Sequence, residues 1–169
     1  MAITLDGSNL TTVGVINSGT VQNSTSGTSI DFTGIPSGTK RITVMMSGVS
    51  TNGTSRVMLQ LGAGSITATG YLSSATQNTS GSPSTTTNTT GFVVDDLTNA
   101  AGIRFGHVVF TLLGSNTWVQ SSVMGRSDTA GTNLSGGYIA LGGTLDRVRI
   151  TTIGGTDTFD AGSINILYE

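Results

Sequence analysis

The sequence predicts an all-β protein, an antiparallel β-sandwich of jelly-roll-like type with an extended N-terminal arm. Three observations lead to this fold class. Apolar and polar residues alternate along most of the chain, which is the pattern of a sheet with one buried face. Glycine-rich turn sequences recur between the alternating segments. No window favours an amphipathic helix, because glycine or β-branched Thr and Val interrupt each one.

The chain is expected to divide into an arm, residues 1–27, and a β-sandwich domain, residues 28–169. The arm is rich in small polar residues and alternates weakly. Val, Ile, Leu and Phe make up 42 of the 169 residues, a larger share than the roughly 20% below which disorder is favoured. The net charge of −2 is also low, so we expect one folded domain with a core of its own.

Strands are predicted wherever the alternation is clear. Ile42, Val44 and Met46 give the clearest example, since Arg41, Thr43, Met45 and Ser47 lie between them. The predicted strands span residues 28–32, 40–49, 55–62, 66–72, 91–95, 104–113, 117–124, 137–141, 147–153 and 163–168. The segments 104–113 and 117–124 are the most apolar, so we expect them at the centre of a sheet or in a subunit interface.

Residues 73–90, SSATQNTSGSPSTTTNTT, are interpreted as a low-complexity polar loop. A structureless loop of this length is uncommon inside a compact domain and is usually functional or disordered. The segment is therefore a candidate for specific binding.

The composition excludes several classes of function. Charged residues are only 9% of the chain, and seven basic residues against nine acidic ones leave no surface suited to a run of phosphates. The absence of cysteine excludes disulfides, Cys-ligated zinc and a thiol nucleophile. No apolar stretch approaches the roughly 20 residues that span a bilayer, and the N-terminus does not resemble a signal peptide. We expect a soluble protein made in the cytoplasm, with no nucleic-acid partner and no membrane insertion.

The sequence predicts neither a catalytic nor a metal site. His107 is the single histidine, and no Gly-x-Ser-x-Gly sequence accompanies it, so a structural role is favoured and no cofactor is expected. The neighbouring Asp95 and Asp96 would point to opposite faces of a strand and cannot flank one sugar ring as in a glycosidase. They are interpreted as turn residues, with calcium binding as the less favoured alternative. Asp157 and Asp160 are interpreted in the same way.

Candidate receptor-binding residues lie in and beside the polar segment 73–90. Tyr71 offers an aromatic face and a hydroxyl group, and Gln77, Asn78 and Asn88 offer the paired donors and acceptors that suit glycan hydroxyls. The three amides suit a solvated linker equally well. Trp118 alternates with core residues, so its burial is favoured.

Several phrases of the chain resemble a module found at the C-terminal end of many bacteriophage tail-fibre proteins. These phrases are IDFTGIPSGTKRITVMMSGVSTNGTSRVMLQLG, TGY, SNTWV and LDRVRITTIGGTDTFDAGSINILYE. The resemblance covers roughly residues 25–72 and 103–169. It implies a virion protein, an all-β module, a homotrimer and recognition of the host surface, and it brings no catalytic motif. Relatives often carry the module after a longer shaft, whereas about 25 residues precede it here.

Three functions follow as hypotheses. The favoured one is a receptor-binding tail-fibre module that binds host cell-surface polysaccharide, with its arm attached to other virion proteins. The second is a decoration protein that stabilises a capsid or tail, and the third, which scarce carboxylates disfavour, is a polysaccharide depolymerase. The mean hydropathy of +0.14 favours an apolar subunit interface in any such assembly.

Arg147 and Arg149 are the candidates for subunit contact. Val148 and Ile150 alternate with them and are expected in the core, as are Ile164 and Ile166 of the last strand. The two arginines would then share the opposite face, where Asp146, Asp157 or Asp160 could neutralise them.

Overall fold

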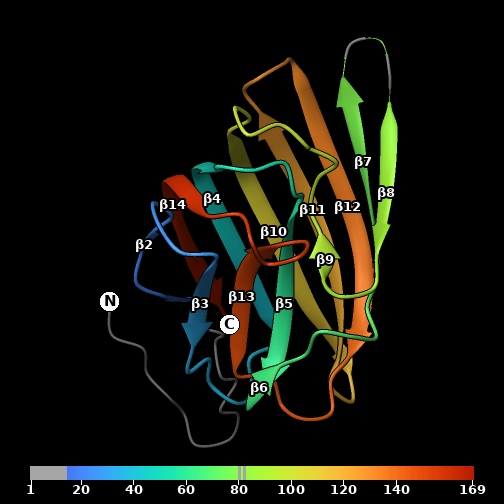
Figure 1. Ribbon diagram of the computed structural model, residues 1–169. Helices are drawn as coiled ribbons and strands as arrows, with labels where there is room; N and C mark the ends of the chain where they lie inside the picture. Colours follow the sequence, from blue (N-terminus) through green and yellow to red (C-terminus); the bar gives the residue numbers. More distant parts are fainter. Residues whose placement is uncertain (1–14, 80, 82) are drawn as a thin grey trace, which may run out of the picture.

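The computed structural model describes residues 15–79, 81 and 83–169, and it confirms the predicted all-β antiparallel sandwich. Two sheets pack face to face, as Figure 1 shows, and the described residues contain no helix. Residues 1–14, which belong to the predicted arm, lie outside the described residues.

The large sheet has nine strands, in the order β1-β14-β4-β10-β11-β12-β7-β8, with β2 also paired to β14. Its strands are β1 (Asn17–Ser18), β2 (Gln22–Asn23), β4 (Arg41–Thr51), β7 (Leu72–Thr79), β8 (Ser84–Asn88), β10 (Arg104–Gly114), β11 (Thr117–Arg126), β12 (Gly131–Ala140) and β14 (Phe159–Tyr168). The predicted central segments are confirmed at the centre of this sheet, since β10 and β11 have partners on both sides.

The small sheet has five strands, in the order β3-β13-β5-β6, with β9 also paired to β5. Its strands are β3 (Ser29–Thr33), β5 (Val57–Ala63), β6 (Ser65–Ile66), β9 (Phe92–Val93) and β13 (Arg147–Thr152). The chain crosses between the sheets repeatedly, for example from β3 to β4, from β4 to β5 and from β13 to β14. The finer assignment to a jelly roll stays a prediction.

The core lies between the two sheets. Residues that the alternation places inward are buried, including Val44 and Phe110 of the large sheet and Val148 and Ile150 of the small one. Phe92 joins the layers, because its ring lies 4.9 Å from that of Tyr71 and 5.4 Å from that of Phe110, measured between centroids. Contacts of this kind add to the stabilisation that apolar burial provides.

A β-bulge at Gly48 changes which residues of β4 face the core. Ile42, Val44 and Met46 point inward before it, whereas Val49 and Thr51 are buried after it. Gly48 has a φ of 70°, in the left-handed region that glycine adopts without steric cost. The register with β10 shifts at the same place, between Arg104 and Gly106.

The interpretation of residues 73–90 as a structureless loop is wrong. Most of the segment forms β7 and β8, an antiparallel hairpin at the edge of the large sheet. Its polar residues suit a strand because one side of an edge strand faces solvent and threonine favours extended backbone. The predicted strand at 66–72 is also wrong. β6 ends at Ile66 and β7 begins at Leu72, so residues 67–71 connect two strands.

The strands at the end of the chain lie in different sheets. β13 lies between β3 and β5, while β14 lies beside β4. The turn at 153–158 therefore carries the chain from one sheet to the other. The core positions predicted for Ile164 and Ile166 are confirmed. Both edges of β14 have partners, because β1 and β2, from the predicted arm, pair with it opposite β4.

Candidate functional site

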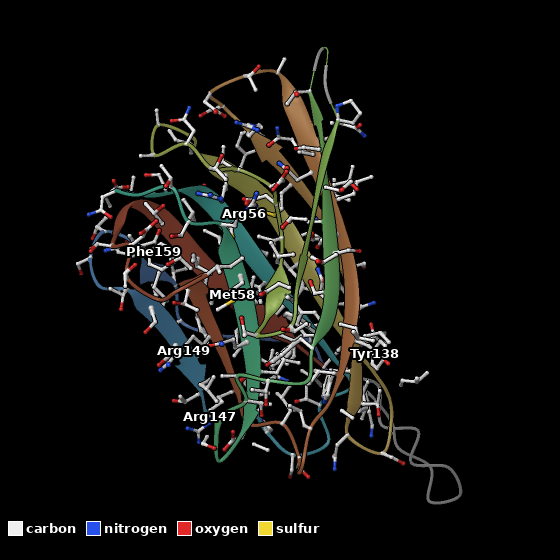
Figure 2. All side chains as sticks on the ribbon, turned by 45° about the vertical axis from the view of Figure 1, so that its right-hand side comes forward. Arg56, Met58, Tyr138, Arg147, Arg149 and Phe159 are labelled. Atoms are coloured by element: carbon white, nitrogen blue, oxygen red, sulfur yellow. The ribbon has the colours of Figure 1, made fainter. Side chains whose placement is uncertain are left out.

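The two outer faces of the sandwich differ in how many charged side chains they carry. On the small sheet, Arg149 forms two hydrogen bonds of 2.7 Å with the carboxylate of Asp31, and Arg147 bonds to Asp146 at 2.8 and 3.0 Å. The hydrogen bonds from Arg147 lower the pKa of Asp146 below its usual value. Figure 2 shows both arginines on this side of the molecule and Tyr138 on the other. The small sheet thus presents ion pairs to solvent.

The predicted position of Arg147 and Arg149 on one outer face agrees with their alternation with buried Val148 and Ile150. Asp146 is the partner of Arg147, as expected, but Arg149 pairs with Asp31, which lies 118 residues away in sequence. Asp157 instead accepts the backbone N–H of Ser55 from the turn at 153–158, as a turn residue would. Asp160 accepts the hydroxyl of Ser50, but it lies in β14, so the interpretation of Asp160 as a turn residue is wrong.

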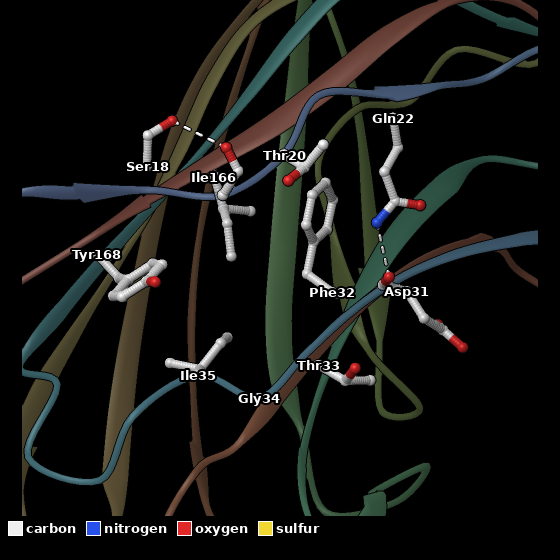
Figure 3. A pocket seen from close by; sticks show the side chains of 11 residues that line it. Ser18, Thr20, Gln22, Asp31, Phe32, Thr33, Gly34, Ile35, Ile166 and Tyr168 are labelled. Carbon is white, nitrogen blue, oxygen red and sulfur yellow. Dashed lines mark hydrogen bonds between the residues drawn. The ribbon is translucent and has the colours of Figure 1, made fainter.

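A polar groove lies beside Asp31, between the N-terminal segment and β3 (Figure 3). Its volume is about 350 Å³. Ser18, Thr20, Gln22, Thr33 and Tyr168 contribute polar side chains, and Phe32, Ile35 and Ile166 contribute apolar ones.

Gln22 connects the two walls of the groove, because its amide Nε2 donates a hydrogen bond of 2.8 Å to the carbonyl oxygen of Asp31. This bond orients the amide, whose oxygen has no protein partner among the described residues. Hydroxyl groups from Thr20 and Thr33 lie on the two sides. Hydroxyls and an amide around an apolar patch match the alternating polar and apolar surface of a sugar.

The outer face of the large sheet is uncharged over five of its nine strands, namely β7, β8, β10, β11 and β12. None of the outward-facing residues of these described strands is Asp, Glu, Lys or Arg. Five large apolar or aromatic side chains on this face are each about half exposed: Leu72, Phe105, Val123, Leu134 and Tyr138. Exposed apolar groups gathered on one face are typical of interaction surfaces.

A buried ionic cluster, which the sequence pattern does not predict, lies at one end of the sandwich. Arg104 and Asp95 form an ion pair whose side chains are 2% and 0% exposed, and the neighbouring Asp96 pairs with Arg56. Burial raises the pKa of Asp95, and the charge of Arg104 opposes this effect. The predicted turn role of Asp95 also holds in part, because it accepts the N–H of Leu97 at 3.2 Å. The inward position of Arg104 follows from its spacing to Val108 and Phe110.

A third ion pair, between Arg126 and Asp128, lies in the same cluster. Arg126 bonds to Asp128 at 2.7 Å through Nε, and also bonds to Gln77. The hydrogen bond from Arg126 lowers the pKa of Asp128. Asp128 also accepts a hydrogen bond of 3.1 Å from the amide of Asn99, so the cluster holds the end of β11 and the 95–104 connection together.

Tyr71 is a correction to the predicted receptor-binding set. Its ring is 1% exposed and packs against Phe92, so it is not accessible to a glycan. The hydroxyl group accepts the N–H of Leu61 at 2.9 Å and donates toward the carbonyl of Thr67 at 2.8 Å. Burial raises the pKa of Tyr71 to about 12. The side chain is part of the core.

The other predicted receptor-binding residues do not gather in one place. Gln77 and Asn88 lie toward opposite ends of the β7–β8 hairpin, since Gln77 pairs with Ser84 and Asn88 with Ser73. Gln77 bonds to Arg126, and Asn88 donates to the carbonyl of Gly91 at 3.0 Å. Asn78 is exposed next to Gln77, with its side chain on the opposite face of the strand.

Two further predictions concern single side chains. The burial of Trp118 is confirmed, as it is 2% exposed in the core. His107 is exposed on the outer face of β10, opposite Val123 and Met45. In the described residues no group of three or more His, Cys, Asp or Glu side chains could hold a metal ion.

None of the described segments forms a helix long and apolar enough to cross a membrane. Comparison with known proteins found no matching family model, no matching curated protein and no matching solved structure.

Proposed function

We propose that the chain is a non-enzymatic binding protein of the phage virion, of tail-fibre type, which recognises a host-surface glycan and acts as a homotrimer. The observation that carries the proposal is the polar groove between the N-terminal segment and β3. Its hydroxyl groups and the oriented amide of Gln22 suit a neutral sugar, and its volume suits one or two sugar rings. The resemblance of the chain to tail-fibre modules supports the virion assignment.

The position of the groove supports a recognition role. Its walls come from β1, β2, β3 and β14, so three separate parts of the chain define its shape. Variation in the exposed residues Thr20 and Thr33 would change the ligand without disturbing the core. A host-recognition protein needs a surface of this kind.

The test is binding of the labelled protein to an array of bacterial surface polysaccharides. The double variant Thr20→Ala/Thr33→Ala removes two exposed hydroxyl groups from the groove. We expect it to lose at least about tenfold in affinity, since each lost hydrogen bond is worth about 1 kcal/mol. The control Thr98→Ala/Thr129→Ala removes two exposed hydroxyls elsewhere and should bind as the parent does. Equal binding by the groove variant, or no bound glycan for the parent, would contradict the proposal.

The alternative is a decoration protein that stabilises a capsid or tail. The uncharged, apolar outer face of the large sheet favours it, because such a face suits a lasting contact within a particle. Removing the protein from particles would then lower their heat resistance and leave adsorption unchanged.

A further inference from the structure

The outer face of the large sheet carries a valley that runs across its strands. The valley consists of small side chains in register: Thr87 of β8, Ser74 of β7, Gly136 of β12 and Ser121 of β11. A hollow of about 460 Å³ lies over its first three residues, with Leu72 at its side. Gly136 has no side chain, so nothing projects from β12 into this hollow at that position.

Two ridges of larger residues border the valley. The first ridge consists of Thr76, Leu134, Val123 and His107, which are paired in that order from β7 to β10. The second ridge consists of Leu72, Tyr138 and Val119, paired from β7 to β11. Leu134 and Tyr138 are four residues apart on β12, so the ridges lie about 13 Å from each other. A row of side chains from another sheet could lie between them.

Charge decides which partner fits. The valley and the ridges carry no Asp, Glu, Lys or Arg. A charged partner would therefore lose the hydration of its charged groups on binding and gain no ion pair in return. The outer face of the small sheet exposes Asp31, Arg147 and Arg149. It is therefore a poor partner for the uncharged valley, because these charged groups would lose their hydration on contact. The uncharged face of a second copy matches the valley.

The chemistry of the ridges favours protein over glycan. Leu72, Leu134 and Val123 are each about half exposed, and the valley offers hydroxyl groups but no amide or carboxylate side chain among its own residues. Amide and carboxylate groups would offer a sugar paired donors or acceptors that the valley lacks. Subunit interfaces, by contrast, are enriched in aromatic residues and depleted in charge at their core.

We propose that the valley and its two ridges form the surface through which copies of this chain associate, with a ridge of one copy lying in the valley of another. The inference deepens the proposed function, because it names the contact surface of the homo-oligomer assumed there. The groove beside Asp31 shares no residue with the valley or the ridges, so each proposal can fail without the other.

Gly136 allows a test in which the monomer is left intact. A Cβ atom added there would lie 3.7 Å from its nearest neighbour, the carbonyl oxygen of Gln120, which is ordinary van der Waals contact. Gly136→Val therefore fills the valley while retaining the fold, and valine also favours a strand. Gly142→Val is the matched control, because an added Cβ atom at Gly142 meets nothing within 4 Å and the residue lies outside the valley.

The measurement is the molar mass in solution by light scattering across a concentration series. We expect a multiple of the 17.1 kDa chain mass for the parent and for Gly142→Val, and the single-chain mass for Gly136→Val. Leu134→Arg, at an exposed ridge position, should give the single-chain mass as well, and it keeps the test informative if Gly136→Val does not fold. A parent of single-chain mass at every concentration, or folded Gly136→Val and Leu134→Arg variants of parental mass, would overturn the proposal.

Glycan-array binding of the single-chain variants separates the two proposals. Gly136→Val that is monomeric and still binds the array supports both the association surface and the groove. A monomeric variant derived from a parent that binds no glycan supports the association surface and counts against glycan recognition alone.

Discussion

Arg104 and Asp95 form an ion pair in the interior of the sandwich, where both side chains are almost completely excluded from solvent. The guanidinium group also donates a hydrogen bond of 3.3 Å to the carbonyl of Leu97, while its Nη1 atom has no partner among the described residues. The pair therefore links β10 to the connection that precedes it. A buried pair of this kind costs much to break and little to replace as a whole.

The first prediction concerns this pair. Asp95→Asn should lower the free energy of unfolding by about 3–5 kcal/mol, because it leaves the charge of Arg104 buried without a counter-ion. The double variant Asp95→Leu/Arg104→Met should lose less than Asp95→Asn, since it removes both charges. Urea unfolding followed by tryptophan fluorescence measures the difference.

The exposed pair of Arg149 and Asp31 is the matched control. The side chains of Arg149 and Asp31 are 35% and 37% exposed. Asp31→Asn should therefore change the free energy of unfolding by less than about 1 kcal/mol. Equal losses for Asp95→Asn and Asp31→Asn would show that burial does not determine the contribution of these pairs.

A second prediction concerns acid. The hydrogen bond from Arg126 lowers the pKa of Asp128 in the folded state below its unfolded value of about 3.9. The unfolded state therefore takes up the proton first, so the stabilisation is present above about pH 4 and is lost as the pH falls through the folded pKa. Asp146, whose pKa Arg147 lowers, acts in the same direction. Thermal unfolding midpoints should fall between pH 6 and pH 3.

Asp128→Asn tests the assignment of this acid sensitivity. The variant should be less stable than the parent at pH 6, and its midpoint should fall less on acidification, because it has lost one carboxylate with a lowered pKa. Parallel pH profiles for the two proteins would assign the acid sensitivity to other groups.

A third prediction concerns Tyr71. Tyr71→Phe should lower the free energy of unfolding by about 1–3 kcal/mol, because the buried N–H of Leu61 donates to the hydroxyl group that the variant lacks. Since burial raises the pKa of Tyr71 to about 12, this tyrosine should ionise in the folded protein well above the usual tyrosine value of about 10. Ultraviolet titration of parent and variant gives the difference. A tyrosine that titrates near 10 and is missing from the variant would place Tyr71 in contact with solvent.

Much of the fold follows from local pattern. The period-two alternation in residues 41–46, 147–150 and 163–168 identifies strands and their inward faces without any knowledge of their partners. The alternation fails where a bulge intervenes, as at Gly48, because one extra residue reverses the faces of everything after it. It also fails in residues 73–90, where composition favours a loop but β7 pairs with β12 and β8 pairs with β7.

The candidate sites depended more on the tertiary structure. In the sequence, Tyr71 looks like a binding residue because it offers an aromatic face and a hydroxyl group beside a polar segment. In the structure, its ring packs against Phe92 in the core. The groove beside Asp31 and the valley through Gly136 both arise from strands that are distant in sequence. Such surfaces cannot be found from spacing along one strand.

The sequence by itself determined that the chain forms strands, which of their residues face the core where the alternation is unbroken, and that the surfaces carry little charge, because these properties depend on neighbours along the chain. Only the tertiary structure decided that β13 and β14 lie in different sheets, that Arg104 meets Asp95, and that Ser74, Gly136 and Ser121 form one valley. The physical reason is that strand pairing joins backbone groups far apart in the sequence. The choice of partner depends on how all the inward faces pack together.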